Sequence, residues 1–218
     1  MGRSVIIYGK SGSGKSRSLK NFNEDELFLV NVCEKDLPFR KNFKYVFKSD
    51  DAAKIVAGLQ KMPTKVAVID DATYIMVNNF MRNHANKNIN QFDLYNDIAG
   101  SMFGLFQLVK ALPDDVIVYF ILHEDRDSNY GGVTLKTIGK LLDQKCPLES
   151  FVTICLRCMT DGTRHYFRTQ SDGYDITKSP EDMFEGEEID NDLKKVDETI
   201  RAYYGLDDNK TKDKEKKA

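Results

Sequence analysis

One run of eight residues near the N-terminus, Gly9-Lys10-Ser11-Gly12-Ser13-Gly14-Lys15-Ser16, restricts the fold more than any other feature of the sequence. It matches the pattern G-x-x-x-x-G-K-[ST] without a gap, and it follows the apolar run of residues 5–8. In such a loop, glycines allow backbone N–H groups to approach phosphate oxygens, and the following helix points its positive end at the same anion. A strand, this loop and a helix together predict an α/β domain built to hold phosphate groups.

The last two residues of the run have separate expected roles. Lys15 would place a point charge near the β- and γ-phosphates, and Ser16 would offer its hydroxyl to Mg²⁺. ATP and Mg²⁺ are therefore the expected ligands. The candidate nucleotide-binding residues are Gly9, Lys10, Ser11, Gly12, Ser13, Gly14, Lys15, Ser16 and Arg17.

The rest of the chain alternates strand-like and helix-like segments. Unbroken apolar runs at residues 27–33, 66–69 and 116–122 alternate with helical patterns at 52–61 and 92–112. Unbroken apolar strands are typical of a mainly parallel sheet that is covered on both faces. We therefore expect one α/β domain over residues 1–206.

The pattern changes in the C-terminal third. Residues 151–158 and 165–169 flank an Asp-Gly pair, which predicts an antiparallel hairpin. Residues 187–204 have apolar positions at helical spacing, and Gly205 would end this helix. Residues 207–218 contain no large apolar side chain, so a disordered charged tail is expected.

Polar residues at the ends of the apolar strands are the candidates for catalysis. Asp70 ends the run VAVIDD and is expected to hold Mg²⁺, because parallel neighbouring strands would bring it beside the phosphates. Asp71 is either a turn or capping residue or an aid in positioning water. Glu34 ends the second strand and is the candidate general base, with a solvated loop carboxylate as the alternative. His123 ends the fourth strand and would either contact the γ-phosphate or serve the structure.

Composition excludes several classes of protein. The chain has 32 basic and 34 acidic side chains, so it is no bulk polycation, and DNA binding would need a local patch or an oligomer. No run of 18 apolar residues is present, which favours a cytoplasmic protein without a membrane anchor. Cys155 and Cys158 form C-x-x-C within a strand, where residues three apart face opposite sides, so reduced, partly buried thiols are expected instead of a metal or redox pair.

The order of these features resembles the RecA-type ATPase core. More narrowly, residues 3–206 look like the phage-encoded AAA-family ATP-binding proteins of the RecA-like recombination type. The segments that carry the resemblance are GKSGSGKS, VAVIDD, FILHED, KTIGK and EEIDNDLKKVDETIRAYYG. The resemblance implies ATP hydrolysis, with Lys15 and Ser16 on phosphate and Mg²⁺, Asp70 as the Walker B carboxylate and Glu34 as the catalytic glutamate. His123 stands where RecA proteins carry a polar γ-phosphate sensor, usually Gln.

The resemblance also implies partners. Residues 125–145 lie where RecA proteins keep a mobile DNA-binding loop, and they offer Arg126, Tyr130, Lys136 and Lys140 for contact with single-stranded DNA. A plain solvent loop is the alternative. A homo-oligomer and a single-strand-binding or annealing protein are further expected partners, in a host cytoplasm. Because no Arg is an obvious finger in cis, Lys136 or Lys140 could enter a neighbouring subunit's site.

Other P-loop classes fit less well. A nucleotide or small-molecule kinase usually needs an Arg-rich lid, and the candidate lid contains only Arg126. A GTPase needs Asn-Lys-x-Asp, and the stretch NKNI at residues 86–89 lacks the Asp. An AAA+ machine needs a multi-helix lid that the chain after the hairpin is too short to supply. A nucleotide-dependent switch that grips a protein partner stays open, together with the kinase.

Overall fold

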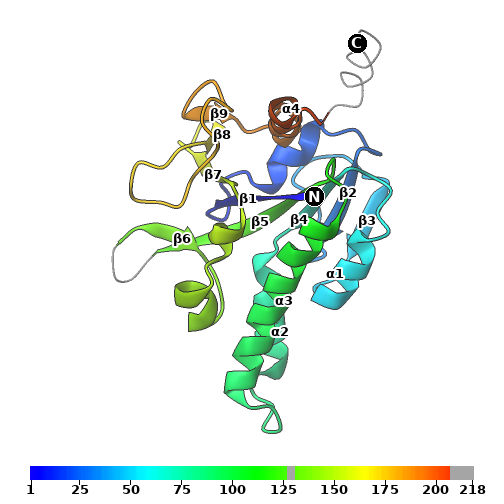
Figure 1. The fold of residues 1–218 in the computed structure, drawn as a ribbon, viewed down its shortest axis with the longest axis vertical. Helices are drawn as coiled ribbons and strands as arrows, with labels where there is room; N and C mark the ends of the chain where they lie inside the picture. The colour runs from blue at the N-terminus through cyan, green and yellow to red at the C-terminus, as the bar shows by residue number, and fades with distance from the viewer. Residues whose placement is uncertain (127–130, 207–218) are drawn as a thin grey trace.

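A mostly parallel sheet of nine strands forms the centre of the protein, as a computed structural model that describes residues 1–126 and 131–206 shows (Figure 1). Five strands run parallel in the order β3 (Tyr45–Lys48), β2 (Leu27–Asn31), β4 (Val66–Asp70), β5 (Ile117–Arg126) and β1 (Arg3–Gly9). The sheet continues through β7 (Ile154–Thr160), parallel to β1, and then β8 (His165–Arg168) and β9 (Glu188–Asp190), both antiparallel to their neighbours. The short β6 (Val133–Leu135) pairs only with the far end of β5.

The strand order corrects the expectation that the strand ending at Asp70 lies directly beside the strand before the glycine-rich loop. Strands β1 and β4 are not neighbours, because β5 lies between them. The parallel registers still bring the strand ends to one edge: Gly9 pairs with His123, and Asn31 pairs with Asp70. The glycine-rich loop, Asp70 and His123 therefore lie at the same edge of the parallel strands, although β5 continues past His123 to Arg126, so His123 does not end its strand as predicted.

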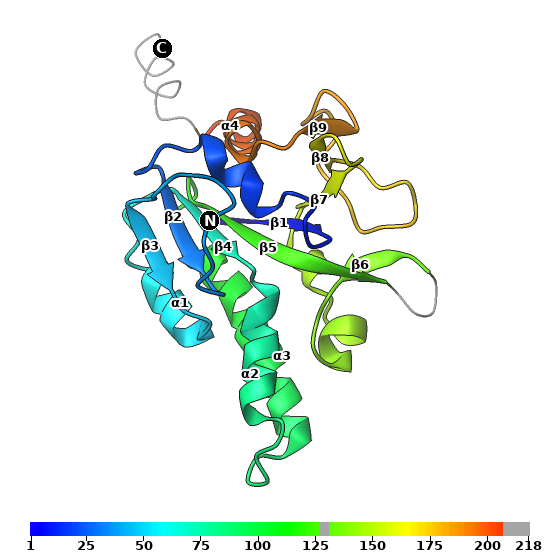
Figure 2. The same cartoon turned by 180° about the vertical axis from the view of Figure 1, so that it is seen from behind.

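Helices cover both faces of the sheet. One face carries α1 (Ala52–Leu59), α2 (Thr73–Asn83) and α3 (Gln91–Ala111), and the other carries α4 (Leu193–Tyr204) and the short 3₁₀ helix η1 (Ser16–Asn21) (Figures 1 and 2). Helices α2 and α3 lie side by side and extend past the sheet as an arm (Figure 2). No described helix is long and apolar enough to cross a membrane.

The unbroken apolar run in β5 explains its central place. Its first six residues are buried, and successive side chains point to opposite faces. Phe120 stacks on Phe106 of α3, with ring centroids 4.2 Å apart, on one face. Tyr119 lies on the other face and donates its hydroxyl to Asp197 of α4 at 2.9 Å. A strand with both faces covered requires apolar residues at every position, which is what the sequence has.

Some elements differ from the sequence expectations. The helix expected after the glycine-rich loop is only the six-residue η1. The helix expected over residues 187–204 starts at Leu193, because residues 188–190 form β9 and Asp192 caps α4 by accepting from two backbone N–H groups. Strand β3, helix α2 and strand β6 were not predicted. The expected tail at 207–218 lies outside the described residues.

The hairpin and the cysteines were predicted correctly. Strands β7 and β8 pair antiparallel across the Asp-Gly turn. Cys155 and Cys158 are free, buried and part of two different cores on opposite faces of the sheet. A pair that is split by the sheet cannot bind one metal ion or form a disulfide without moving the backbone.

Candidate functional site

The glycine-rich loop (residues 9–16) rests against the antiparallel part of the sheet. Gly14 has a φ of +102°, in the region that favours glycine, and a Cβ there would come within 2.7 Å of the His165 Nδ1 atom. The Nδ1 atom of His165 donates to the Ser13 carbonyl oxygen at 2.7 Å. His165 of β8 therefore contacts the loop directly and leaves no space for a side chain at position 14, so only glycine fits there.

Cys158 of β7 supports the same loop. Its buried Sγ donates to the Ser13 carbonyl oxygen at 3.2 Å and accepts from Asn191 at 3.3 Å. Burial raises the pKa of this thiol to about 11, so the thiol is protonated and unreactive at neutral pH. The Ser13 hydroxyl is itself buried and has no hydrogen-bond partner among the described residues. The loop is thus packed against β7, and among the described residues the Ser13 hydroxyl keeps its hydrogen-bonding capacity.

Lys15 is held at the base of the loop. Its side chain is buried, and Nζ donates to the carbonyl oxygens of Gly9 at 2.9 Å and Lys10 at 2.8 Å. Burial lowers its pKa, and the nearby acidic groups oppose that shift. A lysine held in this way presents a fixed positive charge under the loop.

Ser16 and Asp70 meet at the edge of the sheet. Ser16 Oγ donates to Asp70 Oδ1 at 2.9 Å. Burial and the charge of Asp71 raise the pKa of Asp70 to about 6, against the opposing effects of Ser16 and Lys15. A buried carboxylate beside a hydroxyl offers the hard oxygen donors that Mg²⁺ prefers, so these two residues fit the metal. The described residues contain no group of three His, Cys, Asp or Glu that could hold a metal.

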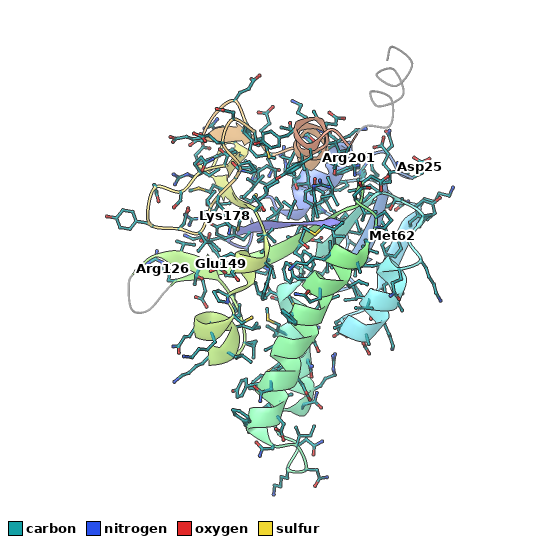
Figure 3. All side chains as sticks on the ribbon, in the orientation of Figure 1. Asp25, Met62, Arg126, Glu149, Lys178 and Arg201 are labelled. Carbon is teal, nitrogen blue, oxygen red and sulfur yellow. The ribbon has the colours of Figure 1, made fainter. Side chains whose placement is uncertain are left out.

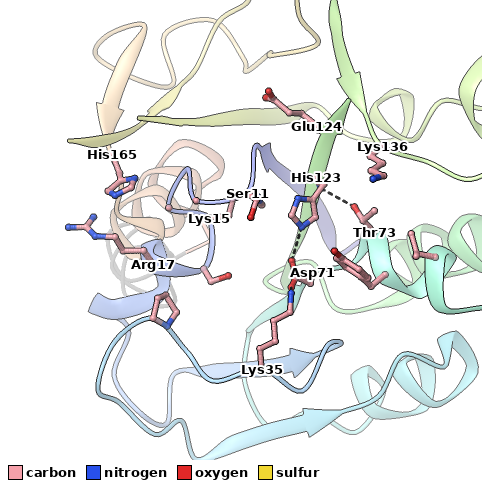
Figure 4. Close-up of a pocket in the computed structure, with 16 residues that line it drawn as sticks. Ser11, Lys15, Arg17, Lys35, Asp71, Thr73, His123, Glu124, Lys136 and His165 are labelled. Atoms are coloured by element: carbon pink, nitrogen blue, oxygen red, sulfur yellow. Dashed lines mark hydrogen bonds and ion pairs between the residues drawn. The ribbon is translucent and has the colours of Figure 1, made fainter. Parts of the chain in front are cut away.

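A cavity of about 670 Å³ opens beside the loop (Figure 4). Its walls come from the loop and η1, the segments after β2 and β4, helix α2, the C-terminal half of β5, the segment after β6, and β8. Its charged and histidine side chains are Lys15, Arg17, Lys35, Asp71, His123, Glu124, Lys136 and His165. This volume lies in the range of small-molecule sites, and most of its charged groups are cations, as a site for an anionic ligand requires.

Three of these side chains form what we call the cavity cluster: Lys35, Asp71 and His123. Lys35 Nζ lies 2.8 Å from one oxygen of Asp71, and His123 Nε2 lies 3.1 Å from the other. Burial would raise the pKa of Asp71, but the hydrogen bonds from His123 and Lys35 outweigh it and hold the pKa well below its usual range. Asp71 also has a φ of +62°, an uncommon conformation for a non-glycine residue. Tyr74 packs edge-on against the His123 ring, with centroids 5.7 Å apart.

A second group, the strand cluster, consists of Glu124, Arg157 and Asp175. Arg157 binds Glu124 through two nitrogens, at 3.0 and 3.3 Å, and reaches Asp175 at 3.2 Å. The exposed fractions of the side chains are 8% for Glu124, 14% for Arg157 and 0% for Asp175. This cluster ties β5 to β7 next to the cavity.

Several predicted residues lie away from the cavity. Glu34 is exposed, has a φ of +53° and does not line the cavity, so its catalytic role stays a prediction that the cavity does not favour. Arg126 (Figure 3) and Lys140 are exposed outside the cavity, on and after the β5–β6 hairpin. Tyr130 lies outside the described residues. Lys136, predicted for DNA or for a neighbouring subunit, lines the cavity of its own chain.

Seven residues that line the cavity were not predicted: Lys35, Pro38, Thr73, Tyr74, Val77, Glu124 and His165. Lys35 and Glu124 each follow a strand-end residue that was predicted, so the sequence located the edge of the sheet but not the side chain that faces the cavity. His165 had no local signal, because its place depends on how the C-terminal hairpin packs on the loop.

Comparison with known proteins adds no family. No family model matches the sequence, and no curated protein is significantly similar to it. The function must therefore be argued from the site.

Proposed function

We propose that this protein binds ATP with Mg²⁺ in a P-loop domain of the RecA-like type and hydrolyses it. The observation that carries the proposal is the Ser16–Asp70 hydrogen bond of 2.9 Å beside the buried Lys15. It joins the end of the glycine-rich loop to the end of β4, residues that are 54 positions apart in the chain. Phosphate binding through such a loop and metal binding through Ser and Asp need this juxtaposition.

Each group then has a role. The loop N–H groups and Lys15 would bind the β- and γ-phosphates. Ser16 and Asp70 would hold Mg²⁺, which supplies positive charge to the β- and γ-phosphate oxygens. Six residues of 3₁₀ helix add little dipole, so the charge of Lys15 and the N–H groups of the loop bear most of the binding.

The cavity cluster provides a base for the attacking water. Because the Asp71 carboxylate can only accept, His123 Nε2 must donate to it, which leaves Nδ1 as the acceptor of the neutral ring. The water oxygen bonds to the γ-phosphorus as the bond to the β,γ-bridging oxygen breaks, with its electron pair kept by ADP. The water proton passes to Nδ1 and then to solvent, and Asp71 stabilises the charged ring.

The test is steady-state ATP hydrolysis by the wild type and Lys15→Ala. Lys54→Ala, which removes an exposed lysine on α1, is the matched control for charge. We expect Lys15→Ala to lose at least about 100-fold in kcat/KM while Lys54→Ala keeps the wild-type value. Thermal melts of all three proteins check folding. Equal turnover in Lys15→Ala and wild type would refute the proposal.

We further propose that single-stranded DNA is the partner and that it binds along the β5–β6 hairpin. The hairpin begins at the cavity, because β5 contains both His123 and the exposed Arg126. Single-stranded DNA bound at the hairpin would lie next to the cavity and could alter the position of the side chains that line it. We expect single-stranded DNA to stimulate turnover and Arg126→Ala to weaken the stimulation. Turnover that ignores DNA would favour a kinase or a protein-binding switch.

A further inference from the structure

Lys136 follows β6, where its backbone is fixed. Its N–H donates to the His123 carbonyl oxygen at 2.8 Å, and the preceding Leu135 is buried. Three residues later Gly139 packs against the ring of Tyr95, where a Cβ would come within 2.9 Å of the ring. The Cα atom of Lys136 is therefore held beside the end of β5, and its exposed side chain lines the cavity.

The other cations of the cavity are already engaged. Lys15 donates to two carbonyl oxygens of the loop, and Arg17 lies 3.4 Å from an amide oxygen. Lys35 pairs with Asp71 at 2.8 Å. The Lys136 ammonium has no hydrogen bond or ion pair with any other described residue. Among the described residues, it is the one lysine or arginine of the cavity without a hydrogen-bond partner, whereas Lys15 and Arg17 bind neutral oxygens and Lys35 binds a carboxylate.

The acidic groups on the nearby walls are also satisfied. Asp71 binds Lys35 and His123, and Glu124 binds Arg157 through two nitrogens. Neither carboxylate needs Lys136 as a partner. In the view of Figure 4, Lys136 lies on the far side of His123 from the glycine-rich loop, and Lys15, His123 and Lys136 line the same cavity.

We infer that Lys136 acts in cis as the cation that stabilises the transferring phosphoryl group, an inference that rests on the proposed ATP hydrolysis. Negative charge builds up on the γ-phosphoryl oxygens and on the bridging oxygen as the bond to ADP breaks. A cation that meets this charge only at the transition state raises kcat without tightening ATP binding. Inserted arginines reach roughly 10³- to 10⁵-fold, and a lysine, which cannot bind two oxygens through a fork, is expected to give about 100-fold.

The cis assignment distinguishes this site from one completed by a neighbour. A trans-acting lysine would come from a neighbouring subunit, whereas Lys136 lines the cavity of its own chain. Because Lys136 is joined to His123 through the backbone of the β5–β6 hairpin, a ligand that moves the hairpin would move the cation. Hydrolysis would then respond to the hairpin's ligand without a change of subunit contacts.

The first experiment compares Lys136→Ala and Lys136→Arg with Lys54→Ala as the charge control. We measure kcat at saturating ATP, the affinity for Mg·ADP, and the affinity for Mg·ADP with fluoroaluminate, which mimics the transferring phosphoryl group. Lys136→Ala should lose about 100-fold in kcat and a similar factor in fluoroaluminate affinity, with Mg·ADP affinity changed less than about 3-fold. Lys136→Arg should recover part of both.

The second experiment mixes subunits. Equal amounts of Lys15→Ala and Lys136→Ala are combined after unfolding and refolding together, and turnover is compared with the separate proteins. A cis role predicts no activity beyond the sum of the two variants. Recovery of activity in the mixture would overturn the cis assignment.

The outcomes separate the two proposals. If the wild type binds neither Mg·ATP nor Mg·ADP with fluoroaluminate, the proposed function fails and this inference fails with it. If the wild type binds them but Lys136→Ala matches Lys54→Ala in turnover and in fluoroaluminate affinity, only the inference fails. Loss of fluoroaluminate affinity in Lys136→Ala alone supports the inference even where turnover is slow.

Discussion

The cavity cluster and the strand cluster each contain carboxylates and cations, and both touch the end of β5, yet they differ in what they can do. Lys35, Asp71 and His123 face the cavity, and the exposed fraction of the Lys35 side chain is 61%. Glu124, Arg157 and Asp175 are almost closed off from solvent. The first cluster can exchange its partners for a ligand. The second has its charges paired in place, which suits a role in joining strands.

The adjacent residues His123 and Glu124 show how this division arises. In a strand, neighbouring side chains point to opposite sides, so one residue can join the cavity cluster while the next joins β7. Both line the cavity, but Glu124 is held by two nitrogens of Arg157. A carboxylate bound in this way is a poor general base, because both of its oxygens already accept from the guanidinium and its geometry is fixed.

The largest effect on stability is expected from Arg157→Leu, which disrupts the strand cluster. The change leaves Glu124 and Asp175 buried without their cation, and loss of one partner of a buried pair costs about 3–5 kcal/mol. Urea unfolding measures the free energy of unfolding. Arg164→Leu is the control, since Arg164 pairs with Asp161 and Glu188 at an exposed site, and its loss should cost far less than the loss of Arg157. Equal losses in both variants would show that the strand cluster is not a buried structural tie.

Asp71→Asn should affect catalysis more than stability. The amide cannot stabilise a charged His123 ring, and its NH₂ group can turn toward Nε2 and favour the wrong tautomer. We expect kcat to fall roughly 100-fold, within the range for general base catalysis, with unfolding free energy changed by less than about 1 kcal/mol. Asp36→Asn, an exposed neighbour of Lys35, is the control. A large loss of stability with unchanged kcat would place Asp71 with the structural carboxylates.

A double-mutant cycle on Asp71 and His123 tests whether the two residues act together. The expected difference in kcat between the double variant and either single variant is small. If the two act as one unit, His123→Ala should lower kcat by an amount similar to Asp71→Asn, and the double variant should be little worse than either. If the fold-loss of kcat in the double variant equals the product of the two single fold-losses, the two residues act independently. Asp71 would then not position the ring.

The sequence predicted the parallel sheet and the edge of the sheet at which the candidate site lies. It predicted fewer of the side chains that line that site. Long apolar runs such as that in β5 report burial directly, and the glycine-rich motif is local, so both could be recognised. The catalytic carboxylate was predicted to be Glu34, but Glu34 has a left-handed conformation and does not line the cavity, where the following Lys35 reaches Asp71. A single residue with positive φ reverses which side chain faces the site, and sequence spacing does not reveal it.

Helix α2 and strand β9 were missed for other reasons. Helix α2 contains several Asn residues, which favour turns in isolation, but its apolar side packs on α3 and the sheet. Strand β9 is three residues long, and its place depends on pairing with β8. His165 reaches the glycine-rich loop only because that hairpin folds back on it. Such tertiary contacts override local propensity.

Lys35→Ala should have the smallest effect of the four changes. The ion pair with Asp71 is largely exposed on the lysine side, and such pairs contribute about 0–1 kcal/mol. Asp71 keeps His123 as a partner, so kcat should fall by less than about 5-fold, whereas Asp71→Asn removes the acceptor itself. The measurement is kcat and unfolding free energy at low and high salt, and the difference between variant and wild type should shrink as salt screens the pair. A loss as large as that of Asp71→Asn would mean that the lysine, not the histidine, keeps the carboxylate in its catalytic place, and the cavity cluster would then depend on a charge at its solvent-facing side.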